Sequence, residues 1–330
     1  MSAPGCALGV MFRRENPPEA LPTYARQVEA MGLDELWVVE DCFYAGGLTS
    51  AAVALAVTDR VRVGLGIMPG VARSPAFSAM EIAALARMYP GRFLPGMGHG
   101  MADWMKQIGV FPKSQLAALS ETAEVVRRLL AGETVTFHGQ HVHHDRVKLE
   151  FPPTEAPPLT LGVRGPRSLA MSGRSADGTI LAELSSPAYV RWARERIQAG
   201  QAEAGRAGAP HRLTVYMLYA VDDDAAAARR RLRPLIASWL SYGQVDYLRP
   251  LGIEEEANDL LARGGREALE AGMPDAWIDQ MAVVGTPDDC AAAVQRLVDA
   301  GADSVGFVTE QPGMEGLAAV ARLLPALRPG

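Results

Sequence analysis

The sequence predicts an α/β protein that folds as a single (β/α)8 barrel, a TIM barrel, over residues 1–330. Short apolar runs alternate with helical patterns about every thirty residues through the first hundred residues. These runs are continuously apolar, as is typical of parallel strands whose two faces are both covered. Eight such strand–helix units fit within the chain, which matches a closed barrel of about 250 core residues.

Four strands are expected in the first hundred residues. The first helix opens at Pro17 and Pro18 and stops at Gly32, which follows the usual preference for proline at a helix start and glycine after its end. The expected strands cover 7–12, 35–39, 61–65 and 92–96, and the next two helices cover 49–58 and 75–88.

The alternation continues towards the C-terminus with two interruptions. Residues 134–145 predict a β-hairpin insertion that turns at Gly139 and follows the fourth unit. Residues 242–272 are polar and less regular, so we expect an irregular insertion near the seventh and eighth strands. The other strands are expected at 158–163, 178–182, 213–221 and 303–308, and the helices at 115–131, from 166, and at 187–205, 223–240, 286–300 and 314–327.

An open, doubly wound sheet is the alternative architecture. That fold usually carries a glycine-rich nucleotide fingerprint after its first strand. Residues 11–15, Met-Phe-Arg-Arg-Glu, follow the first strand here and contain no glycine. We therefore favour the barrel, in which the loops after the strands form the active site.

Composition narrows the class of function. A formal net charge of -6 provides no electrostatic basis for binding nucleic acid. Cys6, Cys42 and Cys290 form neither a disulfide framework nor a CxxC metal motif. No run approaches the ~18 apolar residues of a membrane helix, and the N-terminus lacks the features of a signal peptide. We expect a cytoplasmic enzyme that acts on a small-molecule substrate, without a nucleic-acid or membrane partner.

Titratable residues follow the second and fourth expected strands. Glu40 and Asp41 are adjacent at the end of a buried strand, where low-dielectric surroundings can raise the pKa of one carboxyl group so that it donates a proton. In the alternative interpretation, one of them caps the next helix and the other is solvated. His99 lies in the loop 96–100, where three glycines leave backbone amides open to a ligand; a purely structural histidine is the alternative.

The loop 162–168, Gly-Val-Arg-Gly-Pro-Arg-Ser, predicts an anion site. Gly165 makes the turn and Pro166 starts a helix, so unpaired amides at the helix N-terminus can bind a phosphate, with added positive charge from Arg164 and Arg167. An ordinary helix start is the alternative. The glycines of 64–70 do not form a dinucleotide loop; they indicate either close approach of a flat group or a simple turn.

Four histidines lie on the expected hairpin. Strand alternation puts His141 and His143 on one face and His138 and His144 on the other. No cysteine or spaced acidic set completes a tetrahedral site. We expect exposed polar positions here and no metal.

Motifs in chain order resemble the bacterial luciferase-like superfamily. Within it, the sequence is most similar to the deazaflavin-dependent branch, which uses coenzyme F420 and is typified by methylenetetrahydromethanopterin reductase. The resemblance covers nearly the whole chain. The motifs that carry it are Leu36-Trp-Val-Val-Glu-Asp41, Arg62-Val-Gly-Leu-Gly-Ile67, Ala72-Arg-Ser-Pro75, Pro90-Gly-Arg-Phe93, Leu129-Leu-Ala-Gly-Glu-Thr-Val-Thr136, Leu161-Gly-Val-Arg-Gly-Pro166, Ala176-Asp-Gly178 and Val284-Gly-Thr-Pro287.

The resemblance implies a flavin-type ring at the carboxyl ends of the strands, no metal, and a homodimer formed through the early helices. It implies a non-prolyl cis peptide bond after the third strand, at Gly66–Ile67, and a cofactor phosphate near the loops after the fifth and sixth strands. The cofactor-binding residues carried over in this way are Gly66, Ile67, Gly98, Val163, Gly165, Pro166, Arg167, Ser168, Ser185 and Ser186.

Two positions depart from the family pattern. Many relatives carry Asp-His where this chain has Glu40 and Asp41, and the sugar-phosphate dehydrogenases of the group carry a glutamate where it has Met101. The candidate catalytic residues that remain are Glu40, Asp41 and His99.

Three functions are consistent with these features. The leading hypothesis is an oxidoreductase that transfers hydride between coenzyme F420 and an unidentified small organic substrate. The first alternative is an FMN-dependent luciferase-like monooxygenase, in which reduced flavin reacts with oxygen. The second is a non-catalytic flavin-binding homologue or subunit, which the altered proton-transfer pair suggests.

Overall fold

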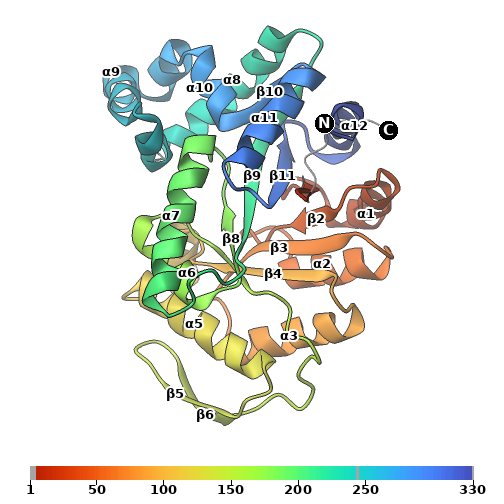
Figure 1. Cartoon of the computed structure of the whole chain (residues 1–330), viewed down its shortest axis with the longest axis vertical. Coiled ribbons are helices and arrows are strands. Elements are labelled where there is room, and N and C mark those ends of the chain that lie inside the picture. Colours follow the sequence, from red (N-terminus) through yellow and green to blue (C-terminus); the bar gives the residue numbers. More distant parts are fainter. Residues whose placement is uncertain (1–4, 243–244, 329–330) are drawn as a thin grey trace. The chain divides into compact units, whose positions relative to one another are not determined.

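The computed structural model describes residues 5–242 and 245–328, which form two compact units. Unit 1 comprises Met1–Met11, Leu181–Glu195 and Leu213–Gly330, and unit 2 comprises Phe12–Ile180 and Arg196–Arg212. Each unit contains parallel strands connected by helices (Figure 1). We describe them one at a time.

Unit 2 contains five parallel strands in the order β2-β3-β4-β7-β8, which follows their order along the chain. The residues of β2 and β4 are buried throughout, and apart from Glu35 they are apolar residues or glycine, as expected of parallel strands covered on both faces. The strands are β2 (Glu35–Val38), β3 (Arg62–Pro69), β4 (Phe93–Gly98), β7 (Thr160–Gly162) and β8 (Gly178–Leu181). The helices are the 3-10 turn η1 (Pro18–Ala20), α1 (Leu21–Ala30), α2 (Gly47–Ala56), α3 (Pro75–Met88), α4 (Ala102–Gln107), α5 (Gln115–Leu130) and α6 (Pro166–Ser175).

The hairpin expected after the fourth unit is confirmed as β5 (Val135–His138) and β6 (His143–Val147). Its turn is fixed by Glu121 of α5, whose carboxylate accepts hydrogen bonds from the backbone N–H groups of residues 140, 141 and 142 at 2.8–3.0 Å. The histidine faces differ from the prediction. The register pairs His138 with His143, both exposed, and places buried His144 opposite Phe137, because the irregular register shifts the alternation.

Unit 1 contains four parallel strands in the order β10-β9-β11-β1. Its helices begin with α7, whose first part lies in this unit. The strands are β1 (Ala7–Phe12), β9 (Arg212–Val221), β10 (Ala282–Gly285) and β11 (Ser304–Thr309). The helices are α7 (Pro187–Glu203), α8 (Ala225–Ser241), the 3-10 segment η2 (Val245–Leu251), α9 (Glu254–Gly272), α10 (Asp275–Met281), α11 (Pro287–Asp299) and α12 (Gly313–Leu327).

All eight strands of the predicted strand–helix units are present, but the region between the seventh and eighth differs from the prediction. The segment expected to be irregular is mostly helical, as η2 and α9. Its acidic first turn and buried apolar positions Ala257 and Leu269 support a helix, whereas the non-helical pair Gly264 and Gly265 breaks the periodicity that would have revealed it. The strand β10 was not predicted; it pairs with β9 beside the expected strands.

Local capping explains where several helices begin. The clearest case is α11, where Thr286 Oγ1 accepts from the Asp289 N–H and the Asp289 carboxylate accepts from the Thr286 N–H at 3.0 Å. Ser114 and Asp224 cap α5 and α8 in the same way with one bond each. Across the described residues, none of the helices combines the length and apolar character needed to cross a membrane.

Candidate active site

The two adjacent carboxylates after β2 have different surroundings. Glu40 forms a bidentate ion pair with Arg73, with 2.8 Å between Arg73 Nη2 and Glu40 Oε2. The same Oε2 accepts a hydrogen bond from the Gly47 N–H at 2.9 Å, at the N-terminus of α2. Through these two interactions Glu40 ties the β2 loop to α2 and to the loop after β3. This corresponds to the capping alternative considered from the sequence.

Asp41, the second of the two carboxyl groups, lies in surroundings that favour its protonated form. Burial raises the pKa of Asp41 above its usual value, and the nearby Glu15 raises it further, while an ion pair with Arg14 opposes the shift. The distance from Arg14 Nη1 to Asp41 Oδ2 is 3.0 Å, and the Asp41 side chain is 35% exposed. The Asp41 carboxyl group is therefore accessible to solvent and has a raised pKa.

His99 follows β4 and is held by hydrogen bonds at both ring nitrogens. Nδ1 lies 3.2 Å from the Gln115 carbonyl oxygen, and Nε2 lies 3.2 Å from Ser168 Oγ. Because a carbonyl oxygen only accepts, Nδ1 carries the proton and Nε2 accepts from the serine hydroxyl. Burial lowers the pKa of His99, and Arg164 lowers it further. His99 is therefore neutral near pH 7 and joins the β4 loop to the start of α6.

The glycines that end β4 and β7 make room for the side chain of Ile67. A Cβ atom added to Gly98 would lie 2.8 Å from Ile67 Cδ1, and one added to Gly162 would lie 2.6 Å from Ile67 Cγ2. Ile67 thus packs against β4 and β7. The sequence had suggested that the backbone at Gly98 is open to a ligand. The Gly66–Ile67 peptide bond is cis, as the resemblance implied, and Cys42–Phe43 is a second cis bond that was not expected.

The N-terminus of α6 has the features expected of an anion site. Its N-cap, Gly165, provides no side-chain hydrogen bond, and a Cβ atom there would meet nothing within 4 Å. The first-turn amides of α6 thus receive no hydrogen bond from an N-cap side chain, and the Arg164 and Arg167 side chains are exposed nearby. Val163, at the end of β7, is buried and belongs to the supporting core. This donor set fits a phosphate or carboxylate group.

The two serines expected near the cofactor phosphate belong to unit 1. Both are fully buried. Ser185 Oγ donates to the Ala182 carbonyl at 2.6 Å, and Ser186 Oγ accepts from the Tyr189 N–H at 3.1 Å and so caps α7. Their hydroxyl groups are thus engaged within the chain, and their assignment to the cofactor stays a prediction.

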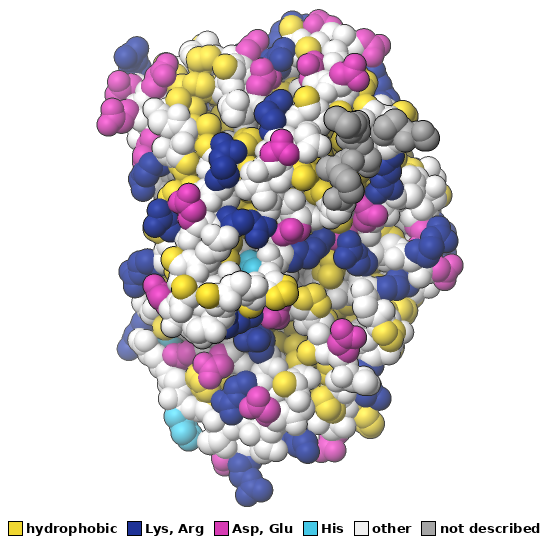
Figure 2. All heavy atoms as spheres, viewed as in Figure 1, with side chains coloured by type: hydrophobic (Ala, Val, Ile, Leu, Met, Phe, Trp, Pro, Cys, Tyr) yellow, Lys and Arg dark blue, Asp and Glu magenta, His cyan; other side chains and the backbone are white. Residues whose placement is uncertain are grey.

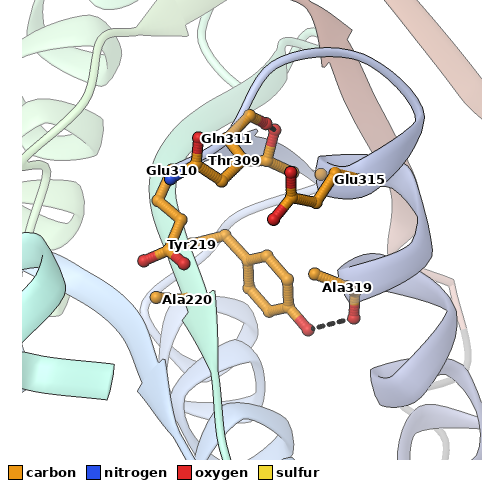
Figure 3. A pocket seen from close by; sticks show the side chains of 8 residues that line it. Tyr219, Ala220, Thr309, Glu310, Gln311, Glu315 and Ala319 are labelled. Carbon is orange, nitrogen blue, oxygen red and sulfur yellow. Dashed lines mark hydrogen bonds between the residues drawn. The ribbon is translucent and has the colours of Figure 1, made fainter. Parts of the chain in front are cut away.

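Unit 1 also contains a small pocket beside α12 (Figure 3). Three of its polar side chains are paired within the chain: Tyr219 donates to the Ala319 carbonyl at 2.8 Å, Thr309 donates to the Gln311 carbonyl at 2.7 Å, and Glu310 pairs with Arg231 at 2.8 Å. The lining residues are Tyr219, Ala220, Thr309, Glu310, Gln311, Glu315, Gly316 and Ala319. We assign no ligand to this pocket.

Sequence reasoning did not single out two arginines of the site, Arg14 and Arg73. A signal was present for Arg14, because it follows β1 directly and loops after barrel strands carry functional groups. Arg73 lies within one of the motifs used for the resemblance, but its partner Glu40 could not be identified without the fold. Over the face visible in Figure 2, basic and acidic side chains are interspersed, in keeping with the low net charge.

Comparison with known proteins identifies the family. The sequence profile described as Luciferase-like monooxygenase matches residues 5–304. The chain belongs to this family. One relative, the 5,10-methylenetetrahydromethanopterin reductase of Methanolobus tindarius, is 28% identical over 302 residues, which cover 90% of this chain and 92% of the relative. The F420-dependent glucose-6-phosphate dehydrogenase of Kineococcus radiotolerans is 28% identical, with 94% of each chain covered.

A solved structure confirms the fold. The coenzyme F420 dependent tetrahydromethanopterin reductase from Methanopyrus kandleri superposes with a TM-score of 0.82 at 21% identity, and covers 98% of this chain and 99% of that one. The luciferase-like chain described here is therefore a (β/α)8 barrel, as predicted, and the doubly wound alternative is excluded.

Proposed function

We propose that this luciferase-like barrel is an oxidoreductase that transfers hydride between coenzyme F420 and a small organic substrate. The observation that carries the proposal is the open N-terminus of α6, where uncapped amides and the Arg164 and Arg167 side chains suit an anionic cofactor group. Relatives that match along nine-tenths of the chain or more include an F420-dependent dehydrogenase, which supports the choice of cofactor.

Each candidate residue has a distinct part in this proposal. When bound, coenzyme F420 supplies or accepts the hydride. The α6 amides and Arg167 bind the anionic part of the cofactor, and Gly165 and Pro166 shape the turn that starts α6. His99 holds the Ser168 side chain beside this anion site through a hydrogen bond. The surface beneath the ring is formed by Ile67, which packs against Gly98, together with Gly66 in the same strand and Val163 just after β7.

Asp41 moves the proton. Its Oδ2 is paired with Arg14, so Oδ1 is the atom that carries the proton to or from the substrate. A carboxyl group with a raised pKa is suited to this role, because the shift brings its pKa closer to neutral pH, where a proton-transfer group works best. Glu40, held by Arg73, is the less suitable candidate.

Cofactor binding and turnover test this function directly. The purified chain would be titrated with F420 and, separately, with FMN, and F420H2 oxidation would be followed against a set of ketones, aldehydes and imines. We expect tight F420 binding that weakens about tenfold in Arg167→Gln, because one charge-assisted contact is lost. The exposed Arg60 provides a matched control: Arg60→Gln leaves binding unchanged. Failure of F420 to bind contradicts the proposal.

The FMN-dependent monooxygenase is the second candidate, and the description of the matched family supports it. The anion site at α6 accepts the FMN phosphate equally well, so that site does not separate the two cofactors. Oxygen-dependent turnover with reduced FMN, without turnover of F420, would establish the monooxygenase. Binding of either cofactor without reaction with any acceptor would support the non-catalytic homologue or subunit.

We further propose that the chain forms a homodimer and acts in the cytoplasm. The support for a dimer is that Val53 of α2 and three residues of α3, namely Phe77, Met80 and Met88, are between 41% and 62% exposed, which is a high apolar content for two surface helices. Light scattering on a sizing column tests it: a dimer that dissociates in Phe77→Glu is expected, and a monomeric wild-type chain contradicts it. None of Cys6, Cys42 and Cys290 forms a disulfide, which suits a reducing compartment.

A further inference from the structure

We infer that Arg14 is a positioning residue, which holds the Asp41 carboxyl group in its place after β2 and connects the loops after β1, β2 and β4. This inference rests on the proposed function in so far as Asp41 handles the proton. The contacts that support it are independent of any cofactor, and all of them lie within unit 2.

The geometry around Arg14 joins three loops. Its Nη1 donates to Asp41 Oδ2 at 3.0 Å, so one carboxylate oxygen is occupied and the other is left for exchange of a proton. The guanidinium carbon lies 5.3 Å from the ring centre of Tyr44 and 5.9 Å from that of Trp104, within the range of cation–π attraction. Tyr44 follows β2, and Trp104 lies in α4, after β4.

A planar guanidinium is suited to this arrangement. Its in-plane N–H groups can bond a carboxylate while its faces lie against aromatic rings, which an ammonium group cannot do equally well. Among the residues that the structure describes, Arg14 is the one cation paired with Asp41. Arg14 therefore sets both the position and the charge environment of that carboxyl group.

The charged groups around Asp41 come from three segments. Arg14 and Glu15 follow β1, and they act in opposite directions on the pKa of Asp41. Glu40, Cys42 and Tyr44 share the loop after β2, and Arg73 comes from the loop after β3. Arg73 is paired with Glu40, and Arg13 with Glu15. Arg14 also lies near Glu15, with 3.4 Å between Arg14 Nε and Glu15 Oε1, and it is the arginine that reaches Asp41.

The test is the titration of the Asp41 side chain by NMR, with 13C-labelled aspartate in the cofactor-free protein and Asp41→Asn to assign the signal. We expect the midpoint to shift upward in Arg14→Gln, because the balancing charge is lost, and to shift less in Arg14→Lys, which keeps the charge but not the stacking. Arg13→Gln is the matched control, because Arg13 pairs with Glu15 and makes no ion pair with Asp41, and we expect it to move the midpoint less than Arg14→Gln does.

Two results overturn the inference: an unchanged midpoint in Arg14→Gln, or an equal shift in Arg13→Gln. If Arg14→Gln does not fold, Arg14→Lys decides, since a wild-type midpoint in that variant contradicts the role of the planar group. F420 titration of the same proteins separates this inference from the proposed function. Absence of F420 binding in the wild-type chain defeats the proposed function alone, whereas the Asp41 titration decides the role of Arg14 in either case.

Discussion

The two ends of strand β2 carry the same kind of ion pair in different surroundings. At its start, Glu35 is fully buried and pairs with both Arg62, at 3.0 Å, and Arg212, while Trp37 Nε1 donates to its other oxygen at 3.0 Å. Just beyond its end, Asp41 is 35% exposed and has one arginine partner, Arg14.

The difference shows how one strand serves stability and chemistry separately. Arg62 and Arg212 begin β3 and β9, so the Glu35 cluster lies at the amino ends of strands, where barrels place structural groups. The Glu35 carboxylate is fully buried and held by three donors, so its role is to tie these strands together. Asp41, with one partner and access to solvent, can change its protonation state. The four predictions that follow test this division between a stabilising end and a reactive end.

The largest effect is expected at the stabilising end. Glu35→Gln removes the charge that compensates two arginines, and breaking a buried ion pair in this way costs about 3 kcal/mol of unfolding free energy. Chemical denaturation measures the loss, with Glu155→Gln, an exposed glutamate, as the control. Cofactor affinity of the folded fraction should be unchanged. A loss below about 1 kcal/mol would show that the cluster is not stabilising.

The next effect concerns the packing of Ile67 between the strands. Gly162→Ala places a methyl group 2.6 Å from Ile67 Cγ2, and overpacking of this kind costs about 2 kcal/mol. All three nearest atoms belong to Ile67, so the double variant Gly162→Ala, Ile67→Ala should lose less stability than the sum of the single variants. Gly165→Ala, with nothing within 4 Å, should be stable. Strict additivity in the double variant would argue against the contact.

A smaller effect separates the two acidic neighbours at the reactive end. Glu40→Gln weakens the bonds to Arg73 and Gly47 and should cost about 1.5 kcal/mol of unfolding free energy. Asp41→Asn should leave stability within about 0.5 kcal/mol of wild type, because burial already favours the neutral group. It should, however, abolish the proton-dependent step of F420H2 oxidation. The reverse pattern, with Glu40→Gln inactive and Asp41→Asn active, would transfer the proton role to Glu40.

The smallest effect is a dependence of stability on pH. Burial lowers the pKa of His99 below its ordinary value of 6.5, so the unfolded chain binds a proton there more readily than the folded chain. The unfolding free energy should therefore decrease as the pH falls below about 6.5, and the bond from Ser168 to Nε2 should be lost. Melting temperatures from pH 8 to 5.5 measure this component, which should be absent in His99→Gln. The same change of melting temperature with pH in the wild-type chain and in His99→Gln would contradict this prediction.

Much of this architecture follows from local patterns. The eight strands of the strand–helix units were located because buried parallel strands are continuously apolar. The helix expected at 286–300 is confirmed as α11, and the structure shows a capping box at its start. Strand β10 was missed because Ala282–Gly285 is short and directly follows α10, without a separating turn signal. Helix α9 was missed because Gly264 and Gly265 interrupt its pattern.

The sequence by itself determined the alternation of strands and helices, the family motifs and the loop that begins α6, since each depends on residues close together in the chain. Only the tertiary structure decided how the titratable residues divide their roles. Glu40 and Asp41 are neighbours in sequence, yet one pairs with Arg73, thirty-three residues away, and the other with Arg14, twenty-seven residues away. The physical reason is that the charge state of a carboxyl group depends on its burial and its partners, and folding brings those partners from distant loops.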